Sequence, residues 1–281
     1  MGDSELYQAI LQRRSVRRYQ RAPLDPVARA RVAAIIDRVE PLLADNAFLL
    51  RRQDHDVDGA MLHLLGGYGK LITPPHLLAP CVTSGRHALV DLGYRMEQVA
   101  VGLTSLGLGS CFIGVLPNER LAAELFDLPP AGRIGALLVY GYLPKRGLDR
   151  ALNGLLHGAM RAGSRLPLDA LCYDEEWQPT GAPDELCALL LAARRAPSAV
   201  NAQPWRFAWR DGALLVLVKR HNSRYGGKIK QEYRYYDGGI CMANLAMAAR
   251  ALDRALSWSL LSDGDLDCPD HLEPLARATL A

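Results

Sequence analysis

Two short segments that lie far apart in the chain carry the side chains best suited to bind an anionic ligand. The first, Arg13-Arg14-Ser15-Val16-Arg17, places three guanidinium groups and a hydroxyl group directly after a short amphipathic stretch. Arginine offers paired N–H donors that match the oxygen atoms of a phosphate. The segment therefore predicts a phosphate clamp, although a solvated helix end, where the helix dipole favours basic residues, would carry the same charges.

The second segment is Ala196-Pro197-Ser198-Ala199-Val200-Asn201-Ala202-Gln203-Pro204-Trp205. Its two prolines restrict the backbone, and Ser198, Asn201 and Gln203 supply hydrogen-bond donors and acceptors. A rigid loop of this kind can bind the edge of a planar heterocycle. The alternative is an ordinary turn between a helix and a strand, with Trp205 in the core.

A third segment, residues 107–114, has the glycine-rich sequence GLGSCFIG. Its spacing does not match the Gly-x-Gly-x-x-Gly fingerprint of dinucleotide-binding proteins. Small residues here allow the backbone to approach a ligand closely. A helix C-terminus followed by a core strand would use the same residues, so this segment alone leaves both interpretations open.

The composition is that of a globular protein. The chain has 281 residues, of which 49% are hydrophobic and 22% charged, enough for one large domain or two fused halves. A net charge of +3 is too small to indicate nucleic-acid binding. The six cysteines lack zinc-site spacing, so we predict no metal site and a reducing compartment. We find neither a signal peptide nor an apolar run long enough to span a bilayer, which predicts a cytoplasmic protein without membrane association.

Hydrophobic periodicity and turn signals predict a mixture of helices and strands. Helices are expected at 5–12, 27–43, 93–106, 119–126, 186–195 and 237–252, and strands at 76–84, 110–116, 134–143, 205–209, 214–218 and 256–261. Residues 46–60 are expected to form a variable loop or an edge strand, and Asp211-Gly212 a hairpin turn. Asp91, Asn118 and Asp237 are predicted to cap helices. These elements indicate an α+β fold with a central, mostly antiparallel sheet flanked by helices.

Two parts of the chain are similar to each other. Arg21-Ala-Pro-Leu-Asp25 resembles Arg165-Leu-Pro-Leu-Asp169, and Asp91-Leu-Gly93 with its helix resembles Asp237-Gly-Gly239 with its helix. Both matches have an offset of about 145 residues, longer than any solenoid period. We therefore predict an internal duplication, with halves at 1–150 and 151–281 that form one compact pseudo-dimeric unit. Chance similarity between amphipathic helices is the alternative.

Together, the RRSxR start, the APSxxNxQPW loop and the LGLGSCFIG segment resemble the FMN-dependent nitroreductase family. Their order resembles single-chain members of the family that are built as an internal pseudo-dimer. The resemblance implies a nitroreductase-like fold with pseudo-two-fold duplication, and a monomer. In the ordinary family dimer, the RRS segment of one subunit and the APS loop of the other meet on the same FMN. Here each segment survives in a different half, so we expect one FMN site per chain.

The resemblance also implies which residues contact the cofactor. Those expected at its phosphate and ribityl chain are Arg13, Arg14 and Ser15, with Arg17 near the pyrimidine ring. The residues expected to line the flavin are Pro197, Ser198, Ala199 and Asn201. The residues expected to pack on the flavin ring are Ile113, Gly114 and Val115, with a backbone N–H group directed at N5. Arg165 resembles a late phosphate-binding arginine, but Gly163 replaces the accompanying family lysine, and a structural role in the repeated segment is equally open.

The activity implied by the resemblance is that of an FMN-dependent NAD(P)H oxidoreductase. A reduced nicotinamide would pass hydride to flavin N5, and the flavin would then reduce a nitroaromatic, a quinone or another small acceptor in a ping-pong cycle. No catalytic acid–base side chain is predicted. The alternative function is a non-catalytic flavin or small-ligand binding protein with a degenerate nitroreductase fold. The basic, tyrosine-rich residues 219–236 are expected to be a solvated loop or a lid at the substrate pocket, with a nucleic-acid surface as their alternative.

Overall fold

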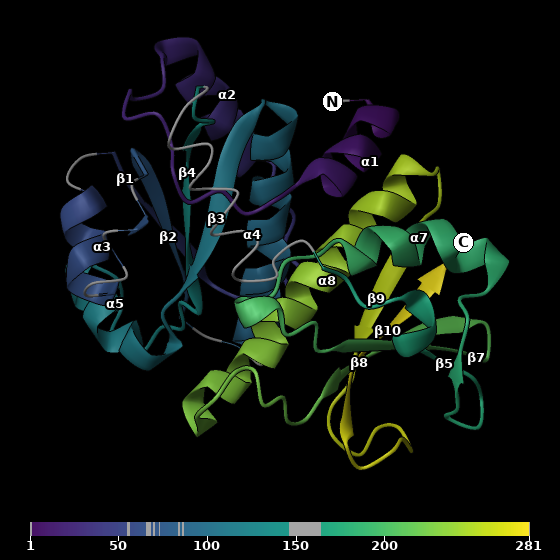
Figure 1. The fold of residues 1–281 in the computed structure, drawn as a ribbon. Coiled ribbons are helices and arrows are strands. Elements are labelled where there is room, and N and C mark those ends of the chain that lie inside the picture. The colour runs from purple at the N-terminus through teal and green to yellow at the C-terminus, as the bar shows by residue number, and fades with distance from the viewer. Residues whose placement is uncertain are drawn as a thin grey trace.

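The computed structural model describes residues 2–280 except 55–56, 66–68, 70, 73, 84, 86 and 146–163. The chain forms two sheets that lie on either side of two long helices, α4 and α8 (Figure 1). One sheet has four strands in the order β1-β2-β4-β3, and the other has six in the order β6-β5-β7-β8-β10-β9. Every pairing is antiparallel except that of β5 with β7. The predicted α+β class is confirmed, with two sheets in place of one central sheet.

Among its described residues, the first half contains four strands and five α-helices. The strands are β1 (Phe48–Gln53), β2 (His76–Val82), β3 (Leu108–Gly114) and β4 (Ala136–Tyr142). The helices are α1 (Asp3–Gln12), α2 (Pro26–Ile36), α3 (Val57–Leu65), α4 (Ala88–Ser105) and α5 (Glu119–Leu125), with a 3₁₀ turn at Leu116–Asn118. β1 forms the edge strand expected within 46–60. The pairing of β2 with β4 ends at Leu78, before Pro80, which has no N–H to donate.

Where the structure describes it, the second half is built from six strands and two long helices. The strands are β5 (Cys172–Tyr173), β6 (Pro179–Thr180), β7 (Trp205–Arg210), β8 (Ala213–Lys219), β9 (Leu256–Leu260) and β10 (Leu272–Leu280). The long helices are α7 (Asp184–Arg194) and α8 (Tyr233–Ala251), with 3₁₀ turns at Leu168–Ala170, Ala199–Asn201 and Lys228–Glu232. Asp211 and Gly212 both have positive φ, which confirms the predicted hairpin turn. β9 confirms the strand expected at 256–261, but the sequence did not predict β10, which follows it and pairs between β8 and β9.

The two halves share one topology. The order β1-β2-β4-β3 corresponds to β7-β8-β10-β9, and α4 corresponds to α8. The long helices cross at two glycines: a Cβ on Gly93 would lie 2.0 Å from the carbonyl oxygen of Tyr236, and one on Gly239 would lie 1.9 Å from that of Val90. Each carbonyl belongs to the residue three positions before the opposite glycine. Such reciprocal contacts are the signature of a two-fold axis, and they support the internal duplication. The expected boundary at 150/151 lies outside the described residues.

The prediction that Asp91 and Asp237 cap helices was wrong, because α4 and α8 begin several residues before them. Asp91 Oδ1 accepts hydrogen bonds from the backbone N–H groups of Leu42 and Leu43. Asp237 Oδ2 accepts from the N–H of Ala199 at 3.0 Å. Asp91 therefore ties α4 to the loop that precedes β1, and Asp237 ties α8 to the loop that precedes β7, the counterpart of β1 in the second half. α2 ends at Ile36 rather than at the predicted residue 43, and the N–H groups of Leu42 and Leu43 are bonded to Asp91 instead of to helix carbonyls.

Two further expectations about local structure were wrong. Asn118 does not cap α5, because its side chain donates to the carbonyl oxygen of Leu64 at 3.0 Å. The matched RxPLD segments are not structurally equivalent: Asp25 caps α2 by accepting from the N–H of Ala28, whereas Asp169 lies in a 3₁₀ turn that precedes β5. The match between the long helices therefore carries the duplication, and the RxPLD match does not.

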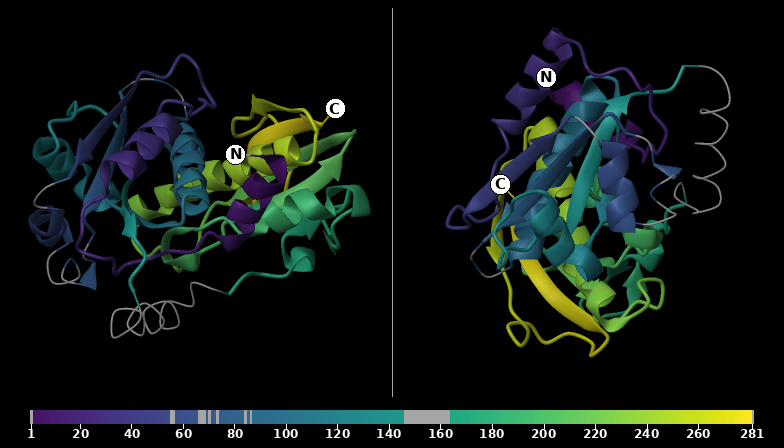
Figure 2. Two further views of the ribbon diagram at one scale, coloured as in Figure 1. Left: turned by 90° about the horizontal axis from the view of Figure 1, so that it is seen from above. Right: turned by 90° about the vertical axis from the view of Figure 1, so that its left-hand side faces the viewer.

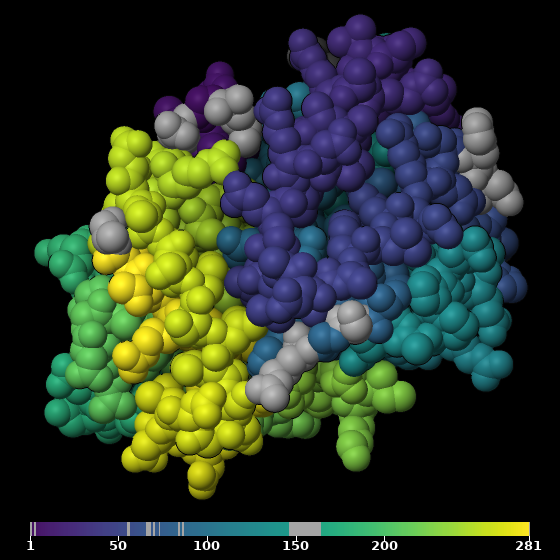
Figure 3. Space-filling model, turned by 180° about the vertical axis from the view of Figure 1, so that it is seen from behind, coloured from purple at the N-terminus to yellow at the C-terminus, as the bar shows by residue number. Residues whose placement is uncertain are grey.

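The N-terminal helix α1 packs against the second half as well as the first. The hydroxyl group of Tyr7 donates to the carbonyl oxygen of Ala188 at 2.9 Å, and Arg195 Nη2 donates to that of Leu11 at 2.8 Å. α1 thus lies beside α7 and α8 (Figure 2). From behind, the first half and the second half meet along a long boundary (Figure 3). The residues that follow α1 are consequently delivered to this boundary.

The described residues also bear on membranes, metals and disulfides. None of the helices in the described ranges combines the length and the apolar character that a membrane-spanning helix needs. Within those ranges, no three His, Cys, Asp or Glu residues are grouped to hold a metal ion. The six cysteines are free, four of them buried and two, Cys187 and Cys268, half-buried.

Candidate functional site

Two cavities adjoin one another at the boundary between the halves. The larger has a volume of about 610 Å³ and the smaller about 50 Å³. Both are lined by five residues from the two predicted segments: Ser15, Arg17, Pro197, Ser198 and Val200. Because these walls are shared, the smaller cavity is a recess of the larger one, whose size is typical of small-molecule sites.

The arginine-rich segment is held in place by the first sheet. The N–H of Val16 donates to the carbonyl oxygen of Ser110 at 2.8 Å, and Ser15 forms a parallel bridge with Ser110. Val16 is buried in the core of the first half. These contacts fix the segment along β3 and leave Ser15 and Arg17, on either side of Val16, to line the cavities.

The polar loop that faces this segment has a strained backbone. Val200, Asn201 and Gln203 all have positive φ, at 49°, 53° and 47°. This conformation is rare for residues other than glycine, and it is a genuine outlier for a β-branched residue such as Val200. The loop is held by the N–H of Gln203, which donates to Ser198 Oγ at 2.9 Å, and by the bond from Ala199 to Asp237. Strain that is maintained by surrounding contacts is typical of ligand-binding sites.

The smaller cavity is strongly positive. It is lined by Arg13, Arg17 and Arg165 together with Ser15 and Asn201. Arg165 donates to Asn201 Oδ1 at 3.2 Å and to the carbonyl oxygen of Arg195 at 3.2 Å. Burial lowers the pKa of Arg165 to about 10, and the nearby charge of Arg13 contributes to this shift. A concentration of guanidinium groups in a partly enclosed space suits an oxyanion such as phosphate.

The larger cavity has apolar and tyrosine walls contributed by both halves. From β3 it receives Cys111–Gly114, and from the second half Tyr225, Tyr233, Tyr236 and Ile240. Gly114 packs so closely on Tyr233 that a Cβ there would lie 2.4 Å from the hydroxyl oxygen, which itself accepts from the N–H of Leu116 at 3.2 Å. Any larger residue at this position would displace Tyr233, and glycine leaves the backbone of β3 uncovered by a side chain where it lines the cavity.

Asp237 is a buried acid in the wall of the larger cavity. Its carboxylate accepts a hydrogen bond from the hydroxyl group of Tyr225 at 2.7 Å. Burial raises the pKa of Asp237 to about 8, and the bonds from Tyr225 and Ala199 offset only part of that effect. Arg17, Arg224 and Lys230 bring positive charge to the same cavity. The cavity as a whole therefore favours a negatively charged ligand.

Ten of the twelve residues predicted to contact a cofactor line one cavity or the other: Arg13, Ser15, Arg17, Ile113, Gly114, Arg165, Pro197, Ser198, Ala199 and Asn201. Arg14 and Val115 line neither. The Arg14 side chain is exposed, whereas Val115 is buried and its N–H donates to the carbonyl oxygen of Gly135 at 2.9 Å. Gly163 lies outside the described residues.

The sequence reasoning missed the contribution of the α8 tyrosines. Tyr233 and Tyr236 were assigned to a loop or lid within 219–236, but they belong to the first turn of α8. Arg224, Tyr225 and Lys230 from the same segment form the adjoining wall. The alternation of basic residues and tyrosines was the available signal, and it indicates a cavity wall rather than a freely solvated loop.

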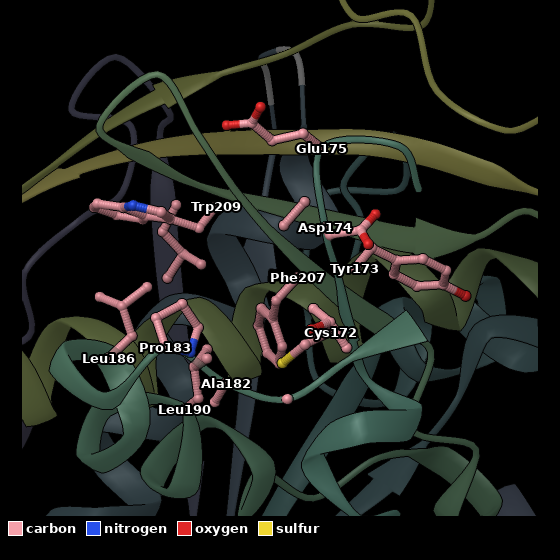
Figure 4. Close-up of a pocket in the computed structure, with 14 residues that line it drawn as sticks. Cys172, Tyr173, Asp174, Glu175, Ala182, Pro183, Leu186, Leu190, Phe207 and Trp209 are labelled. Atoms are coloured by element: carbon pink, nitrogen blue, oxygen red, sulfur yellow. The ribbon is translucent and has the colours of Figure 1, made fainter. Parts of the chain in front are cut away.

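Other cavities lie elsewhere. One, of about 440 Å³, lies beside β5, β7 and α7, with Pro183, Leu186 and Leu190 on one side and Asp174 and Glu175 on the other (Figure 4). The second, of about 430 Å³, lies at the start of α4. Because α4 corresponds to α8, this position in the first half is equivalent to that of the larger cavity at the start of α8. The lining of this second cavity includes the carboxylates of Glu232, Asp263 and Glu273, so it is poorly suited to a phosphate. The two predicted segments contribute to neither cavity.

This architecture, with two like halves and a positive cavity between them, defines a nitroreductase-like α+β protein. The sequence model of the family described as "Putative TM nitroreductase" matches residues 5–249, and the chain belongs to this family. The comparison with curated proteins returned no match.

The fold is also that of a solved structure that aligns over nearly the whole chain. A protein from Thermotoga maritima msb8, described as a "putative nitroreductase", has 19% sequence identity and a TM-score of 0.56, covering 98% of this chain and 93% of its own. A nitroreductase from Bacteroides fragilis NCTC 9343 with bound FMN has 18% identity and a TM-score of 0.42, covering 51% of this chain and 91% of its own. Nitroreductase A from Vibrio parahaemolyticus RIMD 2210633 has 19% identity and a TM-score of 0.44, covering 50% and 69%.

Proposed function

We propose that this protein is an FMN-dependent NAD(P)H oxidoreductase of nitroreductase type that reduces a small acceptor such as a nitroaromatic or a quinone. One observation carries the proposal. Residues from the arginine-rich segment and from the strained polar loop, about 180 positions apart in the sequence, line the same pair of connected cavities. A positive recess that opens into an apolar, tyrosine-lined chamber matches a ligand that has a phosphate at one end and a planar ring at the other.

The residues present fit FMN. Nε and Nη1 of Arg13 are buried and make no hydrogen bond within the described part of the chain, so this arginine retains donors for a ligand. Arg13, Ser15, Arg165 and Asn201 would hold the phosphate in the recess. The ring would lie between Gly114 and the loop at Pro197–Ala199, with Arg17 close to both cavities. Arg14 and Val115 have no part in this assignment.

The chemistry divides between cofactor and protein. Bound FMN would supply hydride transfer between NAD(P)H and the acceptor. The chain positions the ring against the exposed backbone of β3, and Arg17, Arg224 and Lys230 stabilise negative charge that develops in the larger cavity. The tyrosine walls exclude part of the solvent, which strengthens these electrostatic interactions. The physiological acceptor is a small molecule that fits beside the ring in this chamber.

Flavin content and turnover test the proposal. Protein purified without added cofactor should carry up to one FMN per chain, or bind it when FMN is added, and should then oxidise NADH or NADPH when a quinone or a nitroaromatic is supplied. Arg165→Gln should weaken FMN binding by roughly tenfold to a hundredfold, because a hydrogen bond to a charged group contributes about 1.5–3 kcal/mol. Arg21→Gln, at an exposed position that lines neither cavity, is the matched control and should change nothing.

The outcomes separate the proposed function from its alternatives. Stoichiometric flavin binding without NAD(P)H oxidation by any acceptor would favour a non-catalytic flavin-binding protein. An absence of saturable FMN binding would reject the proposal as a whole. Arg165→Gln and Arg21→Gln variants that bind FMN equally well would reject the assignment of the recess as the phosphate site.

A further inference from the structure

Beneath the positive recess lies a buried carboxylate that neither the family resemblance nor the mechanism above explains. Glu97 of α4 is fully buried, and its Oε1 lies 3.6 Å from Nε of Arg13. That distance is too long for a hydrogen bond. Neither carboxylate oxygen has a hydrogen-bond partner among the described residues. The pair is therefore held by charge alone, and Arg13, which also lines the recess, keeps Nε and Nη1 without a hydrogen bond among the described residues.

The groups that surround Glu97 come from several elements. Arg13, at the end of α1, and Arg165, from the segment before β5, bring positive charge, and Arg195 at the end of α7 adds to the field around Arg13. From α8 come Tyr236 and Cys241, whose pKa values are both raised by burial and further by the charge of Glu97, so both stay neutral. One carboxylate thus faces an excess of guanidinium groups.

Even in this positive setting, Glu97 is a weak acid. Burial raises its pKa to about 7, and the charges of Arg13 and Arg165 offset only part of the shift. An ionised carboxylate that is fully buried is expensive unless it is paired, and its protonation removes that cost. The state of Glu97 therefore depends on whether Arg13 is available to it.

The duplication shows that the fold does not require a carboxylate at this position. The helix crossing aligns Gly93 of α4 with Gly239 of α8, so Glu97 corresponds to Ala243, four residues after its glycine. Ala243 is fully buried in the core. The same helix face thus packs with alanine in the second half and carries an acid only in the half that supplies Arg13.

We propose that Glu97 is the exchange partner of the ligand phosphate: it holds Arg13 when the recess contains no anion, and it takes up one proton when a phosphate recruits Arg13. This inference rests on the proposed function. The exchange forms one O–H bond on Glu97, with the proton supplied by solvent. Glu97 is thus a positioning residue that acts through Arg13 and makes anion affinity depend on pH.

The sign of that dependence follows from proton linkage. Binding of the phosphate requires the protonated form of Glu97, so affinity is constant at low pH and falls once Glu97 is ionised in the ligand-free protein. Above its pKa of about 7, the affinity decreases by about tenfold per pH unit. The phosphate monoester, with a second pKa of about 6, titrates in the same range, and a comparison with a variant removes this effect.

The experiment measures the dissociation constant of FMN for the flavin-free protein between pH 6 and pH 8, followed by quenching of flavin fluorescence. In the wild-type protein, affinity should fall by about tenfold over this range relative to Glu97→Gln. Riboflavin, which lacks the phosphate, should show no such difference between the two proteins. Glu124→Gln, at an exposed position, is the control for removal of a carboxylate and should match the wild type. The inhibition constant of sulfate, which does not titrate in this range, should rise by about tenfold between pH 6 and pH 8 in the wild type and stay constant in Glu97→Gln.

A calorimetric measurement makes the test independent of any variant. FMN titrations of the wild-type protein at pH 8, in two buffers with different ionisation enthalpies, should reveal the uptake of close to one proton per FMN beyond the protonation change of the phosphate. Identical pH profiles for wild type and Glu97→Gln, or the absence of this uptake, would overturn the inference and leave the proposed function standing. Failure of both proteins to bind FMN at every pH would overturn both.

Discussion

The crossing of α4 and α8 at two glycines gives the sharpest prediction about how this protein holds its site together. A Cβ on Gly239 would meet the backbone of Val90 at 1.9 Å, and one on Gly93 would meet the backbone of Tyr236 at 2.0 Å. An ordinary contact is at least 3.4 Å, so Gly239→Ala forces the helices apart by about 1.5 Å. Backbone atoms inside a helix cannot rotate out of the way, and the movement must be shared by both halves.

The magnitude follows from two opposing effects. Overpacking of this kind typically costs about 1–3 kcal/mol, and the upper part of that range applies where the obstacle is backbone. Alanine is favoured over glycine within a helix by about 0.5–1 kcal/mol, which offsets part of the cost. We therefore expect Gly239→Ala and Gly93→Ala each to lower the free energy of unfolding by roughly 2 kcal/mol. The site lies between the halves, so both should also weaken FMN binding.

Gly238 provides a matched control on the same helix. A Cβ there would meet side-chain atoms alone, a methyl of Leu275 at 2.5 Å and one of Val218 at 3.3 Å, and these can shift more easily than backbone. Gly238→Ala should therefore change stability by less than about 1 kcal/mol, with helix propensity offsetting the repacking. Urea unfolding followed by circular dichroism measures all three variants. The reasoning is refuted if Gly238→Ala lowers the free energy of unfolding as much as Gly239→Ala does. It is also refuted if the losses for Gly93→Ala and Gly239→Ala differ widely, because reciprocal contacts require similar costs.

Two further predictions concern single residues of the site. The first is Glu97→Gln. Because folding raises the pKa of the wild-type carboxyl group, its contribution to stability is complete below about pH 4.5 and is lost as the pH rises through about 7. Urea unfolding at the low and high ends of this pH range should show the wild type losing roughly 3 kcal/mol of stability relative to the variant, and an equal change in both proteins would contradict the assignment. The second is Gly114→Ala. The new methyl group displaces the Tyr233 hydroxyl group and breaks the hydrogen bond that it accepts from Leu116, which should cost about 1 kcal/mol and weaken FMN binding. Gly181→Ala, with open space around it, is the control and should be neutral, and equal FMN affinity in both variants would show that the cavity tolerates the methyl group.

Much of the architecture was accessible from the sequence, because local patterns encode it. Apolar periodicity predicted the long helices and most strands, and Asp211-Gly212 specified a hairpin that the structure contains. Helix ends were less accurate: α4 and α8 begin before the predicted residues, since tertiary contacts rather than capping residues set their starts. The matched Gly93 and Gly239 revealed the duplication, because only glycine allows two helix backbones to touch.

The sequence alone determined which residues are chemically able to bind an anion and a planar ring, since residue type fixes charge, donors and backbone freedom. Only the tertiary structure decided which of them meet. It placed Arg13 and Asn201 on one recess while turning the neighbouring Arg14 outward, and it added Tyr233 and Asp237 from a helix whose start was mispredicted. It also set Glu97 beneath Arg13, which no local pattern encodes, because the proximity of charges distant in sequence arises from packing of the whole chain.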